Sequence, residues 1–189
     1  MQMDKILNIG IVEDNPYMRE SWEAFIDLEK DMCVIGGWES FEDAWESKKL
    51  EQCDVIIMDI ELPGKSGIEG VAQIRAHKMN PIIIMATIFD DDDNIFNALK
   101  AGATGYLLKK TSPEDFIKAI RQSVNGGSPM TPNIARKVIK AFHVKPTDSG
   151  KQLTEREVQI LKELATGRSY VEIGKKIFLS VDGVRHHIR

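Results

Sequence analysis

Five polar residues that could do chemistry each follow directly on a short apolar run. Glu13 and Asp14 follow IGIV, Asp59 follows VIIM, Thr87 follows IIIMA, and Lys109 follows GYLL. Three clustered carboxylates repel one another unless a cation neutralises them, and hard oxygen ligands favour Mg²⁺, which readily shares a phosphate. A carboxylate neutralised in this way can attack phosphorus and form an acyl phosphate. The residue types therefore predict a magnesium-assisted phosphoryl acceptor, with Asp59 as its nucleophile.

The two remaining residues suit the group that would be transferred. Mg²⁺, the Lys109 ammonium and the Thr87 hydroxyl could each hold one oxygen of a phosphoryl group. Taken singly, each of these residues is more often an ordinary polar group at the end of a strand. Their presence at the ends of successive apolar runs favours one shared site, because independent features then agree.

The apolar runs alternate with amphipathic helical stretches through residue 125. The runs at 55–60 and 82–86 are almost entirely apolar, as is typical of central parallel strands covered on both faces. Five β-α repeats predict an α/β fold with a doubly wound, five-stranded parallel sheet. Ligands of such sheets bind beyond the carboxyl ends of the strands, at the switch point between the first and third. The expected strands are Lys5–Val12, Cys33–Trp38, Val55–Ile60, Ile82–Ala86 and Thr104–Leu108.

Capping signals mark the starts of the helices between these strands. Asparagine, serine and aspartate are the residues that cap helix N-termini, and proline is favoured at the first helical position. A glutamate or aspartate three residues after the cap strengthens the signal. The five expected starts are at Asn15-Pro16, Ser40 with Asp43, Ser66 with Glu69, Asp90–Asp93 and Ser112-Pro113.

Three segments divide the chain. The turn sequence NGGSP, which begins at Asn125, ends the first, so residues 1–128 are expected to form one domain. Residues 129–150 are expected to be a linker with one helix, from Thr131-Pro132 to about Phe142. Residues 151–189 carry three more helix signals, and short helices joined by tight turns predict a small all-α helix-turn-helix segment. These signals are Thr154 with Glu157, Ser169 with Glu172, and Ser180.

The charge of the chain is divided between these segments. Residues 1–128 hold 13 basic and 23 acidic residues, a net charge of −10. Residues 129–189 hold 12 basic and 6 acidic residues, a net charge of +6. The basic end is a candidate for nucleic-acid binding, although a merely solvated basic tail has the same composition.

Cysteine usage and the N-terminus bear on the compartment. Cys33 and Cys53 form no CxxC pair, so neither a disulfide framework nor a zinc site is indicated, and a reducing cytoplasm fits. The N-terminal MQMDKILNIGIVEDN has the pattern of neither a signal peptide nor a membrane span. We therefore expect a cytoplasmic protein without a membrane partner.

Residues 4–125 resemble the receiver domain of two-component response regulators. That family has an acid pair after strand 1, a phosphorylated Asp after strand 3, Thr or Ser after strand 4, and Lys after strand 5. Here these motifs are IVEDN, IIMDIELPGKSG, IIIMAT and GATGYLLKK. The resemblance implies a flavodoxin-like strand order, 2-1-3-4-5, a sensor histidine kinase as phosphoryl source and Asp59 as phosphoacceptor. It also implies that Mg²⁺ is held by Glu13, Asp14, Asp59 and the backbone carbonyl of Glu61.

Tyr106 matches the aromatic switch of the same family. In that interpretation, a phosphoryl group on Asp59 draws the Thr87 hydroxyl inward and opens room for the tyrosine ring to move. An aromatic ring fixed in a half-buried pocket would give the same sequence, and the two interpretations are equally weighted.

Residues 151–189 resemble the helix-turn-helix of LuxR-type regulators, through LTEREVQILKELATGRSYVEIGKKIFLSVDGVRHHIR. A receiver joined to this domain is typical of the NarL/FixJ subfamily. The resemblance implies phosphorylation-controlled binding of promoter DNA, and a homodimer that forms on phosphorylation. Arginine can pair with guanine or hold phosphate, so we expect DNA contacts from Arg185, His186 and Arg189.

One departure concerns the end of the chain. The LuxR-type domain has a fourth helix, and this sequence stops at Arg189, inside the third. The resemblance thus implies an incomplete domain, in which Val181, Val184 and Ile188 lack their cover. We expect these 189 residues to bind DNA weakly or not at all. The alternative function is a receiver that acts through protein–protein interaction and carries an inert tail.

A phosphatase is the rival among enzymes. Haloacid-dehalogenase-like phosphatases also use an Asp after an apolar strand, but they need a second Asp two residues on. This chain has Glu61 there, followed by Leu62 rather than Thr or Val. We therefore expect no enzyme, only a protein that accepts a phosphoryl group on its own aspartate. Turnover of a simple aryl phosphate by this chain would favour the phosphatase hypothesis instead.

Overall fold

The computed structural model describes residues 6–143 and, further along the chain, residues 159, 160, 163, 173, 176, 177 and 179. The chain divides into two compact units, Met1–His143 and Val144–Arg189. Within the described residues, none of the helices is both long enough and apolar enough to cross a membrane.

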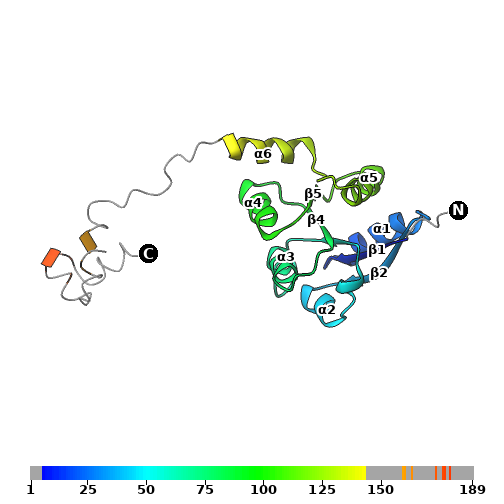
Figure 1. The fold of residues 1–189 in the computed structure, drawn as a ribbon, viewed down its shortest axis with the longest axis horizontal. Helices are drawn as coiled ribbons and strands as arrows, with labels where there is room; N and C mark the ends of the chain where they lie inside the picture. Colours follow the sequence, from blue (N-terminus) through cyan, green and yellow to red (C-terminus); the bar gives the residue numbers. More distant parts are fainter. Residues whose placement is uncertain are drawn as a thin grey trace. The chain divides into compact units, whose positions relative to one another are not determined.

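The first unit is built on one sheet of five parallel strands in the order β2-β1-β3-β4-β5 (Figure 1). The chain moves outward from β1 to β2 and then crosses back to β3, so the winding direction reverses between β1 and β3. The predicted α/β fold and its strand order are confirmed. The strands are β1 (Leu7–Val12), β2 (Met32–Trp38), β3 (Val55–Met58), β4 (Ile82–Thr87) and β5 (Gly105–Leu108).

The strand ends differ from the prediction by at most two residues, and the differences have a local cause. β3 ends at Met58 rather than Ile60, because the backbone N–H of Ile60 donates to the Asp59 carboxylate (2.7 Å) rather than to a neighbouring strand. β4 runs one residue further than predicted, to Thr87, whose carbonyl accepts a hydrogen bond from the backbone of Lys109. Both differences lie at the edge where the chemistry was predicted.

Helices cover both faces of the sheet. One apolar core lies between the sheet and α1 and α5, and includes Trp22, Phe116 and Ile57. The other lies between the sheet and the remaining helices, and includes Phe41 and Ile56. Ile56 and Ile57 belong to opposite cores because successive side chains of a strand point to opposite faces. The helices are α1 (Pro16–Asp27), α2 (Phe41–Glu46), α3 (Gly67–Ala76), α4 (Asp92–Ala101), α5 (Pro113–Val124) and α6 (Pro132–His143), with a 3₁₀ turn at Leu50–Gln52.

The predicted helix starts are confirmed by their capping contacts. The Asn15, Ser40 and Ser112 side chains accept hydrogen bonds from backbone N–H groups of the first turns of α1, α2 and α5. Ser66 and Glu69 form a complete capping box at α3. Within the run of four aspartates, it is Asp91 that caps α4. Each cap satisfies backbone donors that the helix itself leaves free.

Gly67, the first residue of α3, lies directly against the backbone of Asp59. A Cβ atom at this position would lie 1.7 Å from the Asp59 carbonyl oxygen. The Gly67 N–H donates to the carbonyl of Ile60 (2.9 Å), which brings the chain back over the end of β3. Only glycine allows this approach, and the loop that results fixes the backbone on both sides of Asp59.

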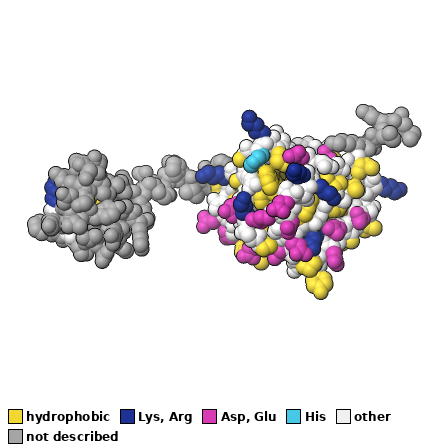
Figure 2. Space-filling model, turned by 90° about the horizontal axis from the view of Figure 1, so that it is seen from below, with side chains coloured by type: hydrophobic (Ala, Val, Ile, Leu, Met, Phe, Trp, Pro, Cys, Tyr) yellow, Lys and Arg dark blue, Asp and Glu magenta, His cyan; other side chains and the backbone are white. Residues whose placement is uncertain are grey.

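Acidic side chains are prominent on one face of the first unit, in keeping with the charge of residues 1–128. Figure 2 shows acidic side chains gathered on the face in view, interspersed with fewer lysine and arginine side chains. Residues 1–128 carry the net charge of −10 counted from the sequence. Such a surface repels the phosphates of DNA rather than attracting them.

The two cysteines are expected to differ sharply in reactivity. Cys33 is exposed, whereas Cys53 is buried, and burial raises the pKa of the Cys53 thiol to about 12. At pH 8 roughly one Cys53 side chain in 10⁴ is then a reactive thiolate. Iodoacetamide at pH 8 should alkylate one thiol of the folded chain and both in urea, as intact mass will show. A Cys33→Ser variant that is alkylated while folded would contradict this prediction.

In the second unit, the described residues include a small apolar core. The members of this core are Ile160, Ile173, Ile177 and the partly buried Leu179. Lys176 and Glu163 form an ion pair, with Nζ and a carboxylate oxygen 2.6 Å apart.

Candidate functional site

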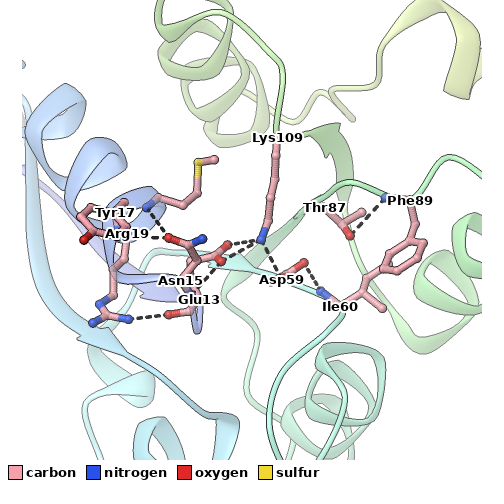
Figure 3. A network of polar contacts seen from close by, with 10 residues as sticks. Glu13, Asn15, Tyr17, Arg19, Asp59, Ile60, Thr87, Phe89 and Lys109 are labelled. Carbon is pink, nitrogen blue, oxygen red and sulfur yellow. Dashed lines mark hydrogen bonds and ion pairs between the residues drawn. The ribbon is translucent and has the colours of Figure 1, made fainter.

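Glu13, Asp59 and Lys109 meet at the carboxyl edge of the sheet, just past the ends of β1, β3 and β5 (Figure 3). Glu13 is fully buried and Asp59 is 3% exposed. The Lys109 Nζ atom lies 2.8 Å from Asp59 Oδ2 and 2.7 Å from the Glu13 carboxylate. The structure thus brings together three of the residues predicted from the ends of separate strands.

The ionisation of this cluster is set by burial and by Lys109. Burial alone would lower the pKa of Lys109, but its hydrogen bonds to Asp59 and Glu13 outweigh this and its pKa is raised. In Glu13 burial dominates, so its pKa is raised although the hydrogen bond from Lys109 lowers it. One ammonium group therefore faces two buried carboxylates, an arrangement that favours a further cation.

The loop after β1 is held in place by two contacts. The backbone N–H of Asn15 donates to Oε1 of Glu13 (3.1 Å), while the Asn15 side chain caps α1. The Arg19 guanidinium of α1 donates to the carbonyl oxygen of Glu13 (2.6 Å). The sequence indicated the cap, but it gave no signal for Arg19, which reaches back across the first turn of α1.

The acid pair and Asp59 fit a divalent cation. Each of Glu13, Asp14 and Asp59 offers a carboxylate oxygen, and these oxygens lie within 4.8 Å of one another. Oε2 of Glu13 is buried and lies 2.7 Å from the Lys109 Nζ atom. Asp14 is exposed and opens on a hollow of the surface that Glu61 also lines. Hard oxygen ligands beside open solvent suit Mg²⁺, which keeps several of its waters.

Thr87 and Tyr106 are linked through the loop between β4 and α4. Thr87 is fully buried, and its hydroxyl oxygen accepts a hydrogen bond from the backbone of Phe89 (3.4 Å). Tyr106 is also fully buried, and its hydroxyl donates to the Phe89 carbonyl (3.0 Å). The ring of Tyr106 thus lies inside the fold, and both side chains hold the same residue of the loop.

Trp22 is a neighbour of the site that sequence reasoning missed. The Lys109 Nζ atom lies 6.0 Å from the centroid of the Trp22 ring, which stacks on Phe116 of α5. The indole forms an apolar wall beside the ammonium group and is within reach of a cation–π contact. A tryptophan on the apolar face of a predicted helix has the pattern of an ordinary core residue, so only the structure shows this contact.

This edge of the sheet has what aspartyl phosphorylation requires. A buried carboxylate lies beside a fixed ammonium group and beside two further acids that could hold a second cation, and a hydroxyl ends the adjacent strand. Among doubly wound folds, this combination defines the class of receiver domains. The loop containing Phe89 ties that chemistry to α4.

Comparison with known proteins agrees with this class. Residues 9–121 match the family model described as the response regulator receiver domain, and residues 151–189 match bacterial regulatory proteins of the luxR family. The uncharacterized transcriptional regulatory protein YxjL of Bacillus subtilis is 34% identical over all of this chain and 88% of its own length. The nitrate/nitrite response regulator protein homolog of Haemophilus influenzae is 30% identical, over 99% of this chain and 89% of its own.

Solved structures show the same architecture. The structure of the response regulator ChrA of a heme-sensing two-component system covers 97% of this chain and 87% of its own, with a TM-score of 0.59 and 26% identity. A LuxR-family response regulator from Aurantimonas sp. SI85-9A1 covers 72% of this chain and 98% of its own, with a TM-score of 0.67 and 27% identity. The chain therefore belongs to the two-component response regulators that join a receiver domain to a LuxR-type DNA-binding domain.

This membership confirms the resemblance found in the sequence and excludes a classical enzyme. The expected DNA contacts, Arg185, His186 and Arg189, lie outside the described residues. They stay predictions, as does the expectation that Val181, Val184 and Ile188 lack their cover, because these residues also lie outside the described part of the chain.

Proposed function

We propose that Asp59 accepts a phosphoryl group from the phosphohistidine of a sensor kinase, and that this modification controls DNA binding by the second unit. The observation that supports the proposal most directly is the buried Asp59 carboxylate, with Lys109 2.8 Å away and two further acids beside it. We further infer that the domains span residues 1–128 and 151–189, with 129–150 between them. Because its DNA target lies in the bacterial cytoplasm, we infer that the protein acts there, and that it can dimerise on phosphorylation.

The transfer forms one bond and breaks one. An Asp59 carboxylate oxygen bonds to phosphorus, and the bond from phosphorus to the histidine nitrogen breaks. The electron pair stays on that nitrogen, and because the other ring nitrogen of the phosphohistidine carries a proton, the histidine leaves as a neutral imidazole. Each Asp59 carboxylate oxygen accepts one hydrogen bond, Oδ1 from the backbone N–H of Ile60 (2.7 Å) and Oδ2 from the Lys109 ammonium (2.8 Å), so the attacking oxygen must give up its contact. Lys109 can then pair with an oxygen of the phosphoryl group, and the Thr87 hydroxyl can donate to another.

Glu13, Asp14, Asp59 and the backbone carbonyl of Glu61 would hold Mg²⁺ beside the acceptor. A bound Mg²⁺ would neutralise charge on the phosphoryl oxygens and lower the repulsion between the acids. The contributions of this chain are to orient Asp59 and to hold the acid pair through Asn15 and Arg19.

The test couples modification to output in one sample, a version of the chain extended by the fourth helix that a LuxR-type domain has. Incubation with acetyl phosphate and Mg²⁺ should add one phosphoryl group, as measured by intact mass. The same sample should then show a changed affinity for duplexes selected from a random DNA pool, as measured by mobility shift. The affinity should fall steeply as salt rises, because phosphate contacts release counterions.

Two controls make the result decisive. With EDTA in place of Mg²⁺, neither the mass nor the DNA affinity should change. An Asp14→Ala variant should need more Mg²⁺ to reach the same phosphorylation, since one metal ligand is lost. A fully phosphorylated chain with unchanged DNA affinity would contradict phosphoryl control and favour a receiver that acts on a protein partner.

A further inference from the structure

α6 is packed onto the first unit rather than extending from it as a bare linker. Ile134 of α6 is fully buried, in the apolar core that also holds Ile95 of α4 and Tyr106 of β5. The segment before α6 adds to the attachment, because the backbone N–H of Tyr106 donates to the carbonyl of Pro129 (2.9 Å). α6 is also the last element before residue 144, where the second unit begins.

One polar contact of α6 reaches the loop between β4 and α4. The Lys137 ammonium donates to the backbone carbonyl of Asp90. It also lies 3.9 Å from the Asp90 carboxylate and 3.6 Å from that of Asp92. The Lys137 side chain is 32% exposed, so these contacts are partly screened by water. Lys140, on the same helix, is exposed and forms no ion pair among the described residues.

The same loop is held from inside by Thr87 and Tyr106. The backbone N–H of Phe89 donates to the Thr87 hydroxyl, and the Phe89 carbonyl accepts from the Tyr106 hydroxyl. Lys137 holds the adjacent residue, Asp90, from outside. Thr87, Tyr106 and Lys137 therefore hold two consecutive residues of one loop, and a shift of that loop alters all three contacts.

We propose that Lys137 is a latch that keeps α6 on α4 until Asp59 is phosphorylated, which rests on the proposed function. A phosphoryl group on Asp59 takes the Thr87 hydroxyl as a hydrogen-bond donor and draws it away from Phe89. The loop then shifts, the Asp90 carbonyl withdraws from Lys137, and α6 is loosened. Because only one partly exposed cation is released, the change is small enough to be reversible and to be set by a single phosphoryl group.

Amide hydrogen exchange of residues 132–143 tests the latch in the full chain. Addition of Mg²⁺ and beryllofluoride, a phosphoryl mimic, should make these amides exchange about three to ten times faster. A Lys137→Met variant should exchange at the faster rate without the mimic and respond little to it. The matched control, Lys140→Met, should behave like the wild type.

A second pair of variants, at Thr87, tests whether the effect of phosphorylation reaches α6 through the Thr87 hydroxyl, while the contact between Lys137 and Asp90 is left in place. Thr87→Val should take up a phosphoryl group more slowly, because one phosphate contact is lost, and once phosphorylated it should leave the exchange of α6 unchanged, while Thr87→Ser should restore the response. If the wild type gains the phosphoryl mass and α6 exchanges as before, the latch is wrong and the proposed function stands. If no phosphoryl group is gained, the proposed function fails, and the latch with it.

Discussion

The Asp59→Asn variant is expected to gain no phosphoryl group from acetyl phosphate under conditions in which the wild-type chain gains one. An amide oxygen is a far poorer nucleophile than a carboxylate, so the rate should fall by a factor on the order of 100 or more. The fold should persist, because the single asparagine oxygen can still accept one of the two hydrogen bonds that Ile60 and Lys109 now donate to separate oxygens of Asp59, and Lys109 keeps its ion pair with Glu13. Intact mass after a timed incubation gives the uptake, and thermal unfolding confirms the fold.

A matched control lies at the other end of the same strand. Asp54 precedes β3, and its carboxylate accepts a hydrogen bond from the backbone of Asn8 (3.0 Å), which an asparagine can also do. The Asp54→Asn variant should therefore be phosphorylated like the wild type. Equal uptake by the Asp59→Asn and wild-type chains would place the acceptor on another residue.

Much of this site could be predicted because each of its residues follows an apolar run. In a parallel sheet the carboxyl ends of all strands lie on one edge, so Glu13, Asp59, Thr87 and Lys109 are gathered there whatever the details of packing. The order of the strands, which places β1 beside β3, came from the resemblance to receivers. The structure added the distances, the burial and the single ammonium shared by two acids.

What could not be predicted depends on contacts between residues far apart in the sequence. Lys137 contacts Asp90 across 47 positions, and Lys109 approaches Trp22 across a longer interval. α6 was expected as the helix of a linker, and its amphipathic sequence does not say which surface its apolar face covers. The local signals of capping and turns were reliable because they involve residues three or four positions apart.

The Lys109→Met variant is expected to lose about 3 kcal/mol of unfolding free energy at neutral pH, because it leaves Glu13 and Asp59 buried with no cation. Methionine fills a similar volume against Trp22, so most of the loss should be electrostatic. Urea unfolding without Mg²⁺ measures it. The neighbouring Lys110→Met, which removes an exposed lysine, should change stability little. Added Mg²⁺ should stabilise Lys109→Met more than the wild type, since it replaces the missing cation.

The pH dependence of the unfolding free energy shows whether Lys109→Met is destabilised by the lost charge or by lost packing. The pKa of Glu13 is raised in the fold above its ordinary 4.5, and it should rise further without Lys109, so the folded variant binds more protons than the unfolded chain. Its stability deficit should therefore be smallest below pH 4.5 and grow as Glu13 ionises. The raised pKa of Lys109 stabilises the wild type below 10.5 and stops doing so as pH passes the folded value. The deficit should thus shrink again at strongly alkaline pH, and a deficit equal at every pH would show that lost packing, not charge, is its cause.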